Sequence, residues 1–266
     1  MNILVTLDKA YVEVLAVMLK SLLMADRRNS FTVYVMNSTL TAGDFKYLKE
    51  RLPAERIKLV DIKTDDSLLA AAPVTDRYPR EMYYRIFAAA FLPPEVDRVL
   101  YLDPDLVVLK PLDGLYNTDL GEMYFAAASH VGSLLTKVNN LRLKTGDDSP
   151  YINSGVMLMN ISLLRAQQDW GRVLEYIRRH RSMLVLPDQD VISGMYGDRI
   201  MEIDPLVYNM TDRLLMHPDT ADRGVDMAWV ARNTAIIHFC GRNKPWKERY
   251  RGPLGFIYHW IAAGEV

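Results

Sequence analysis

Short apolar runs alternate with amphipathic segments along the first 62 residues. Residues 2–7, 31–37 and 56–62 are apolar, β-branched or aromatic stretches of strand length. Between them, the apolar residues of 10–25 and 42–52 recur at helical spacing. A strand-helix-strand-helix-strand order predicts a parallel sheet with helices packed on it.

The rest of the chain continues this mixture less regularly. Residues 63–79 have no clear period and contain two prolines, which is typical of a long lid or binding loop. A polar stretch occupies 131–150. The other predicted elements are a helix over 80–92, strands on both sides of residues 103–105, strands over 124–130 and 151–161, helices over 162–180 and 188–197, and a strand over 234–240. The predicted class is α/β, with a mixed central sheet flanked by helices.

Composition narrows the class of protein. The 266 residues are 50% hydrophobic, which supports one large core, and no internal repeat or linker divides them. The net charge of -1 provides no broad attraction for nucleic acid or anionic lipid, so recognition of a phosphate group must be local. One cysteine, Cys240, excludes an intrachain disulfide and fits a reducing compartment.

Targeting and membrane signals are weak. The first residues, MNILVTLDKAY, lack the basic region and cleavage site of a signal peptide. The apolar stretch 256–263 is too short to span a bilayer, which needs about 20 apolar residues. We expect a soluble cytoplasmic protein without a transmembrane segment; peripheral attachment to the inner face of the membrane stays open.

Two aspartates flank a proline inside the otherwise apolar stretch RVLYLDPDLVVLK. Asp103 and Asp105 share one side of an extended segment, and Pro104 removes a ladder hydrogen bond, so a strand is predicted to stop there. Open α/β sheets bind ligands at the carboxyl ends of their strands. The pattern fits either a solvated Asp-Pro turn or a Mg²⁺ or Mn²⁺ site beside a diphosphate.

Other nucleotide-binding signatures are missing from the sequence. It contains no G-x-G, no P-loop and no Cys/His cluster for zinc. A phosphate ligand would therefore need a metal and a separate cation. His238, which ends an apolar strand, and Lys244, in a loop with Gly241, are candidates for these roles. Each alone is equally an ordinary strand-end histidine or surface lysine.

Five segments resemble glycosyltransferase family 8 in their order and spacing. They read LVTLDKAY, YLDPDLVV, NSGVMLMN, LPDQDVISG and HFCGRNKPW, and the matching blocks run through nearly the whole chain. The family includes bacterial lipopolysaccharide galactosyl- and glucosyltransferases and, more distantly, glycogenin. The resemblance implies a GT-A fold in one domain, 1–266, with a nucleotide-binding half (1–105) and an acceptor and catalytic half (106–266).

The same resemblance implies a reaction. A hexose, glucose or galactose, would pass from a UDP-hexose donor to a saccharide or lipid-linked saccharide acceptor, with Mn²⁺ (or Mg²⁺) as cofactor, release of UDP and retention of anomeric configuration. It implies Gln189 and Asp188 as catalytic residues and Asp103, Asp105 and His238 as metal ligands. The implied donor-binding residues are Thr6, Leu7, Asp8, Tyr11, Arg85, Pro104, Gly241 and Lys244. The implied sugar and acceptor contacts are Asn153, Ser154 and Trp246.

Three alternatives stay open. A sugar nucleotidyltransferase shares an α/β nucleotide-binding half, although VTLDKAY lacks the glycines and arginines of a triphosphate loop. A non-catalytic nucleotide-sugar-binding protein would have no need of the full residue set. A glycosidase would need two carboxylates around the bond, and Asp188 and Asp190 are close in sequence, but acids in a helix's first turn more often stabilise the helix dipole.

Overall fold

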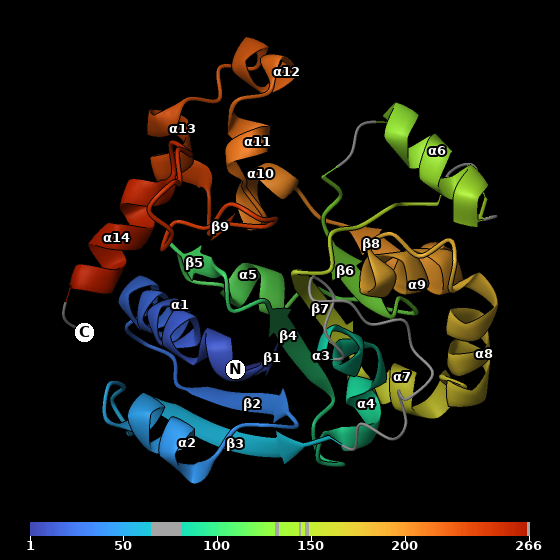
Figure 1. Ribbon diagram of the computed structural model, residues 1–266, viewed down its shortest axis with the longest axis horizontal. Helices are drawn as coiled ribbons and strands as arrows, with labels where there is room; N and C mark the ends of the chain where they lie inside the picture. The colour runs from blue at the N-terminus through green and yellow to red at the C-terminus, as the bar shows by residue number, and fades with distance from the viewer. Residues whose placement is uncertain (65–80, 131–132, 144, 147–148, 265–266) are drawn as a thin grey trace.

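The protein is described here from a computed structural model covering residues 1–64, 81–130, 133–143, 145–146 and 149–264. Its centre is a seven-stranded mixed sheet in the order β3-β2-β1-β4-β7-β6-β8, and β5 and β9 form a separate two-stranded sheet (Figure 1). The strands are β1 (Asn2–Thr6), β2 (Phe31–Asn37), β3 (Ile57–Lys63), β4 (Arg98–Leu102), β5 (Leu106–Val108), β6 (Phe125–Ala127), β7 (Val156–Asn160), β8 (Ile200–Glu202) and β9 (Ile236–His238).

The predicted parallel half is confirmed. Strand β1 pairs in parallel with β2 and with β4, and β2 pairs in parallel with β3. Helix α1 (Val12–Ala25) follows β1 through the short 3-10 turn η1 (Lys9–Tyr11), and α2 (Ala42–Lys49) connects β2 to β3. The second half is mixed, since β7 runs antiparallel to both β4 and β6 while β8 is parallel to β6.

Helices cover both faces of the sheet and extend beyond it (Figure 1). The helices after β3 are α3 (Glu81–Tyr84), α4 (Ala88–Phe91), α5 (Asp113–Tyr116), α6 (Ser133–Leu143), α7 (Ile161–Gln167), α8 (Trp170–His180), α9 (Pro187–Tyr196), α10 (Pro205–Tyr208), α11 (Asp212–Leu215), α12 (Pro218–Asp222), α13 (Met227–Asn233) and α14 (Gly255–Ala263). Two further 3-10 turns are η3 (Arg85–Phe87) and η4 (Gly197–Arg199). No helix in these described ranges is long and apolar enough to cross a membrane.

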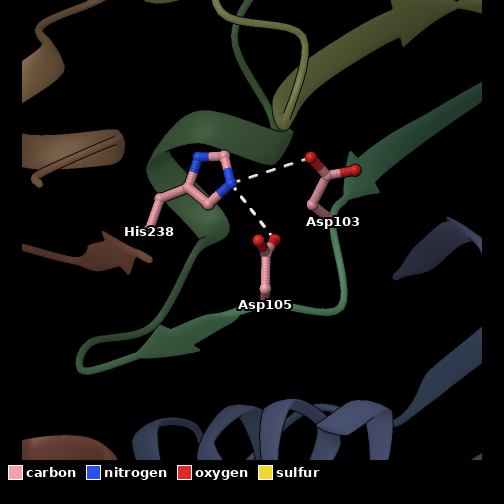
Figure 2. A group of neighbouring side chains, drawn as sticks. All are labelled: Asp103, Asp105 and His238. Carbon is pink, nitrogen blue, oxygen red and sulfur yellow. Dashed lines mark hydrogen bonds and ion pairs between the residues drawn. The ribbon is translucent and has the colours of Figure 1, made fainter. Parts of the chain in front are cut away.

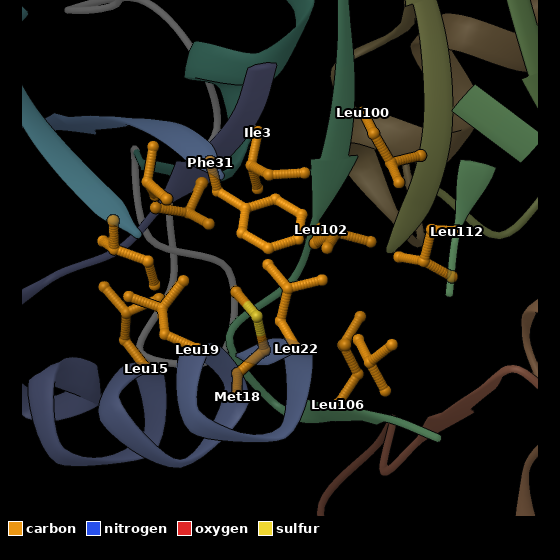
Figure 3. Close-up of a cluster of buried hydrophobic side chains, with 14 of the residues drawn as sticks. Ile3, Leu15, Met18, Leu19, Leu22, Phe31, Leu100, Leu102, Leu106 and Leu112 are labelled. Atoms are coloured by element: carbon orange, nitrogen blue, oxygen red, sulfur yellow. The ribbon is translucent and has the colours of Figure 1, made fainter. Parts of the chain in front are cut away.

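The residues of β1 and β4 divide between two hydrophobic cores according to their parity. Ile3 and Val5 of β1 face the core beneath α1, where Leu15, Met18, Leu19 and Leu22 pack on the sheet (Figure 3). Leu4 faces the opposite core, which α3, α4 and α7 to α9 cover. In β4 the same alternation puts Leu102 under α1 and Tyr101 on the other face. A parallel sheet covered on both faces needs such continuously apolar strands.

The stretch around Asp103 changes sheets. Strand β4 ends at Leu102, residues 103–105 form a turn, and β5 begins at Leu106. Strand β5 then pairs antiparallel with β9, and the register sets Leu106 opposite His238. The predicted end of the strand at Pro104 is therefore confirmed, and Asp103 and Asp105 lie in the turn between β4 and β5. The turn brings the carboxylates beside a strand that lies more than 130 positions later in the sequence.

Several predicted elements differ in extent. The helix expected over 80–92 is divided into α3, η3 and α4, and the tight turn of η3 coincides with the burial of the Arg85 side chain. The helix expected over 162–180 is two helices, because the Asp169 side chain accepts the Arg172 N–H and starts α8 anew. The strand expected over 151–161 begins only at Val156.

Other segments were not anticipated, among them α5, α6 within the polar stretch, β8, the four short helices α10 to α13, and α14. The strands expected over 124–130 and 234–240 are shorter, as β6 and β9. The loop expected over 63–79 falls almost wholly outside the described residues.

Candidate active site

Two carboxylates and one imidazole meet at the carboxyl end of β4. The His238 Nε2 atom lies 3.2 Å from Asp105 Oδ1 and 3.7 Å from Asp103 Oδ2 (Figure 2). One ligand atom from each of the three residues lies within 4.8 Å of the others. Asp105 and His238 are buried and Asp103 is partly exposed, so the group has one open side. Carboxylate oxygen and imidazole nitrogen are donors that Mn²⁺ and, with more oxygen ligands, Mg²⁺ accept.

Lys244 contacts the second aspartate. Its Nζ atom forms an ion pair with Asp105 Oδ2 and donates to the Phe239 carbonyl oxygen at 2.9 Å. Burial alone would raise the pKa of the Asp105 carboxyl, but Lys244 and His238 lower it by more, so the net shift is downward. Burial alone would lower the pKa of the Lys244 ammonium, but Asp105 raises it by more. The net shift is therefore upward, and the lysine keeps its charge. Lys244 is thus the ion-pair partner of Asp105.

Arg85 joins the first aspartate to Asp188. Its Nη1 atom lies 3.0 Å from Asp103 Oδ1 and 3.1 Å from Asp188 Oδ2. The Ser154 hydroxyl donates to Asp188 Oδ2 at 2.6 Å. Burial raises the pKa of the Asp188 carboxyl by more than Arg85 and Ser154 lower it. Residues from η3, the turn after β4, the turn before β7 and helix α9 therefore converge on one buried ion-pair network.

The charges of this network do not balance. Asp103, Asp105 and Asp188 provide three carboxylates, whereas Arg85 and Lys244 provide two cationic side chains. An uncompensated buried charge is expensive. A divalent cation beside Asp103, Asp105 and His238 would more than offset the one excess carboxylate, and the donor atoms of the group fit such an ion.

Tyr101 forms a hydrogen bond with Asp103 that the sequence pattern did not predict. Its hydroxyl donates to Asp103 Oδ1 at 2.6 Å and lies 2.9 Å from Thr6 Oγ1. The Arg85 guanidinium lies 4.4 Å from the centre of the Tyr101 ring. The only signal for this role is its position two residues before Asp103 in an apolar strand.

The side chains of Asn153 and Gln189 are in contact with each other. The Asn153 Nδ2 atom donates to Gln189 Oε1 at 3.1 Å. Asn209, which the sequence analysis did not single out, donates to Asn153 Oδ1 at 3.1 Å and accepts from the His238 ring at 2.9 Å. Gly155 is a second missed residue, because a Cβ atom there would lie 2.2 Å from His238 Cε1.

The predicted donor-binding residues near the first strand are arranged unevenly. The Tyr11 ring meets the Trp246 ring edge to face, with centroids 6.1 Å apart, and Lys244 Nζ lies 5.7 Å from the Trp246 centroid. Asp8 instead accepts the Ala10 N–H and caps η1, and Leu7 is buried in the core beneath α1. Tyr11 is thus in contact with Trp246, and Trp246 with Lys244, whereas the contact of the Asp8 side chain is a cap on η1.

Two loop positions carry the backbone around the site. Pro104 lies in the turn between the two aspartates. Gly241 has a φ of 90°, in the left-handed region that glycine adopts without strain, and it starts the loop that returns Lys244 to Asp105.

Asp190 is excluded from this chemistry by its partners. Its carboxylate pairs with Arg142 at 2.6 Å, accepts the Tyr151 hydroxyl at 2.8 Å and accepts the Leu186 N–H at 3.1 Å. It is fully buried and anchors the start of α9 to α6. Asp188 and Asp190 therefore do not form a glycosidase pair, and Asp190 has a structural role at the start of α9.

Residues 2–249 match the profile of glycosyl transferase family 8. The chain belongs to glycosyltransferase family 8. It is therefore a glycosyltransferase, and the predicted resemblance is confirmed.

Individual relatives are distant but cover most of the chain. General stress protein A of Bacillus subtilis is 27% identical over 98% of this chain and 93% of its own length. A lipopolysaccharide 1,2-glucosyltransferase of Escherichia coli is 23% identical over 91% of this chain and 72% of its own length. Among solved structures, the galactosyltransferase LgtC in complex with donor and acceptor sugar analogues superposes with a TM-score of 0.86, covering 100% of this chain and 96% of its own at 22% identity. The fold is therefore the GT-A fold, as predicted.

Proposed function

We propose that this protein transfers a hexose, glucose or galactose, from a UDP-hexose to a saccharide or lipid-linked saccharide acceptor, with retention of configuration and release of UDP. The observation that carries the proposal is the Asp103–Asp105–His238 group, which adjoins Lys244 at the carboxyl end of β4. Relatives named as a lipopolysaccharide 1,2-glucosyltransferase and a lipopolysaccharide 1,3-galactosyltransferase support the sugar class.

The residues present fit a divalent cation, Mn²⁺ or Mg²⁺. Asp103, Asp105 and His238 would hold it, and its charge would offset the excess carboxylate of the network. When bound, such an ion stabilises the negative charge of a leaving diphosphate. The Lys244 ammonium, now on Asp105, supplies a second positive charge for the phosphates.

The remaining residues would hold the donor. Tyr11 would offer an aromatic face for the uracil base, and Thr6, which ends β1, with Leu7 and Asp8 would line the donor site beside it. Arg85 and Asp188 would grip the hexose hydroxyls, with Asn153 and Ser154 next to them. Gly241, Pro104 and Trp246 would shape the walls around diphosphate and acceptor. Under this proposal residues 1–105 form the nucleotide-binding half and 106–266 the acceptor and catalytic half.

Gln189 would act at the anomeric carbon. An amide is a poor nucleophile compared with the carboxylates that form glycosyl-enzyme intermediates. Its oxygen is better suited to face the positive charge that develops on the sugar. The acceptor would attack the same face of the sugar from which UDP departs. In this front-face substitution the departing phosphate oxygen takes the acceptor proton, so no enzyme base is needed.

The proposal also gives the place of the reaction. UDP-hexoses are substrates of the cytoplasm, where a protein with one unpaired cysteine is stable. A lipid-linked acceptor would bring the enzyme to the inner face of the membrane as a peripheral protein.

A nucleotide-sugar screen tests the proposal. Purified protein is incubated with UDP-glucose, UDP-galactose and other nucleotide sugars, with MnCl₂ or EDTA, and UDP and pyrophosphate are measured. We expect Mn²⁺-dependent UDP release from a UDP-hexose, and its loss in Asp105→Asn. Asp97→Asn is the matched control, because Asp97 is exposed and precedes the opposite end of β4. Release of pyrophosphate would instead identify a nucleotidyltransferase, and undiminished turnover in EDTA would remove the metal from the proposal.

A further inference from the structure

A continuous line of hydrogen bonds connects a proposed metal ligand to the proposed catalytic amide. His238 Nδ1 lies 2.9 Å from Asn209 Oδ1, Asn209 Nδ2 lies 3.1 Å from Asn153 Oδ1, and Asn153 Nδ2 lies 3.1 Å from Gln189 Oε1. The line bridges β9, the end of α10, the turn before β7 and helix α9. The proposed reaction uses His238 as a metal ligand and Gln189 at the anomeric carbon. It does not by itself require that hydrogen bonds through Asn209 and Asn153 connect these two side chains.

A backbone amide sets the direction of the whole line. The Gly155 N–H lies 3.1 Å from Asn153 Oδ1, and a backbone N–H can only donate, so the Asn153 atom facing it is oxygen. Asn209 must then present its NH₂ group to that oxygen, which leaves its own oxygen facing His238 Nδ1. An amide oxygen can only accept, so His238 Nδ1 carries the hydrogen.

This direction has consequences at both ends. At one end, a neutral His238 has its lone pair on Nε2, the atom that faces Asp103 and Asp105 and that a metal would use. At the other end, Asn153 donates to Gln189 Oε1 and holds that oxygen in place, while its second lone pair stays available. The same amide direction therefore prepares the ligand nitrogen and the catalytic oxygen.

We propose that Asn209 is a positioning residue that fixes the tautomer of His238 and, through Asn153, the orientation of the Gln189 amide. The inference rests on the proposed function, in which His238 binds the metal and Gln189 faces the anomeric carbon.

Asn209 is held firmly enough for this role. It is fully buried, its backbone N–H donates to the Pro205 carbonyl at 3.0 Å, and its backbone oxygen lies 2.7 Å from His130 Nε2. The side chain thus cannot turn to solvent, and each of its polar atoms has one partner in the line. A buried amide with both ends committed specifies one arrangement of its neighbours.

Two substitutions of Asn209 separate its two links. Asn209→Asp keeps an oxygen for the His238 Nδ1–H but has no hydrogen to donate to Asn153. Asn209→Ala removes both links. The affinity for Mn²⁺ would be measured without substrate, by electron paramagnetic resonance of the free ion. We expect the affinity of Asn209→Asp to stay within about threefold of the wild-type value, because a carboxylate partner keeps the imidazole a good ligand. We expect Asn209→Ala to lose about 10–100-fold in Mn²⁺ affinity, as loss of a ligand's partner commonly does.

Turnover should respond differently from metal affinity. Both variants should lower kcat by about 10–100-fold, since each releases Asn153 and with it Gln189. Asn160→Asp is the matched control: it makes the same change at the far end of β7, where a carboxylate caps α7 as well as the amide does, and both Mn²⁺ affinity and kcat should stay at wild-type values. A purely structural Asn209 would instead shift both properties together in both variants.

A double-mutant cycle tests whether Asn209 acts through Gln189. In a Gln189→Ala background, Asn209→Asp should lower kcat by less than about threefold, because the group that it orients is already gone. Full additivity of the two substitutions would overturn the link to Gln189.

The tautomer can be read without any variant that alters Asn209. In ¹⁵N-histidine spectra of the Mg²⁺-loaded protein, with the signals of His238 assigned by their loss in His238→Ala, we expect the Nδ1–H form. An Nε2–H form, or equal losses of Mn²⁺ affinity in Asn209→Asp and Asn209→Ala, would overturn the proposal. These readouts need no substrate, so a failure to transfer any sugar would count against the proposed function alone.

Discussion

Gly155→Ala should disable the candidate site through one methyl group. The added Cβ atom would lie 2.2 Å from His238 Cε1 and 2.8 Å from Asp103 Oδ2, where ordinary van der Waals contact begins at 3.4 Å. Gly155 is not among the described glycines with a positive φ, so the cost is steric. The methyl group would push apart two of the three residues proposed to bind the metal.

The surroundings leave His238 little room to retreat. Its backbone N–H donates to the Met210 carbonyl at 2.7 Å, its Nδ1 atom is bonded to Asn209, and its ring lies 6.4 Å from that of His130. Overpacking of this kind costs about 1–3 kcal/mol. In a chain of this size each kcal/mol lowers Tm by about 2–4 °C, so a decrease of roughly 2–12 °C is expected.

Thermal melting, Mn²⁺ binding and UDP release would be measured on the same preparation. We expect Mn²⁺ affinity to fall by at least about tenfold and turnover by more, because a displaced ligand loses geometry as well as contact. Gly114→Ala is the matched control, since its added Cβ would meet nothing nearer than the Tyr208 hydroxyl at 3.7 Å. Wild-type Mn²⁺ affinity in Gly155→Ala would refute the assignment of His238 as a ligand.

Three further predictions concern other parts of the molecule. Lys244→Ala should lower the rate of UDP release by about 10²–10³, the usual cost of one lost transition-state contact; an unchanged rate with intact donor binding would remove Lys244 from the site. Gln189→Ala should slow transfer without abolishing it, and Gln189→Glu should not greatly speed it; a stable hexosyl adduct on Gln189, seen by mass spectrometry with donor alone, would contradict front-face substitution. Thr41→Ala should lower the free energy of unfolding by about 1 kcal/mol at neutral pH, since Thr41 and Asp44 form a capping box at α2. Hydrogen bonds from Thr41 lower the pKa of the Asp44 carboxyl, so the stability that this carboxylate contributes is present above its ordinary pKa and lost as the pH falls through the lowered value. The difference in melting temperature between the wild type and Thr41→Ala should therefore be smaller at strongly acidic pH than at neutral pH.

Local pattern was enough for the first half of the fold. The apolar runs that became β1, β2 and β3 are continuous because both faces of a parallel sheet are covered, and the helices between them have amphipathic periods. Prediction failed where tertiary contacts override local preference. The interrupted helix around Arg85 contains no helix-breaking residue, and its guanidinium is instead held by Asp103 and Asp188. Helices α10 to α13 are too short to show a helical repeat of apolar residues, so the sequence pattern did not predict them.

The chemical groups of the candidate site could be predicted before the fold was known. Asp103 and Asp105 around Pro104, a strand-ending His238 and a following Lys244 could be proposed together because their motifs resemble one family in order and spacing. The partner of each group, in contrast, depends on the folded chain. Lys244 lies on Asp105, Arg85 lies between Asp103 and Asp188, and Asn209 joins His238 to Asn153. Pairings of this kind depend on directions and distances between segments far apart in the chain. Spacing along a sequence carries no information on those directions, because hydrogen bonds and ion pairs act over a few ångströms of space.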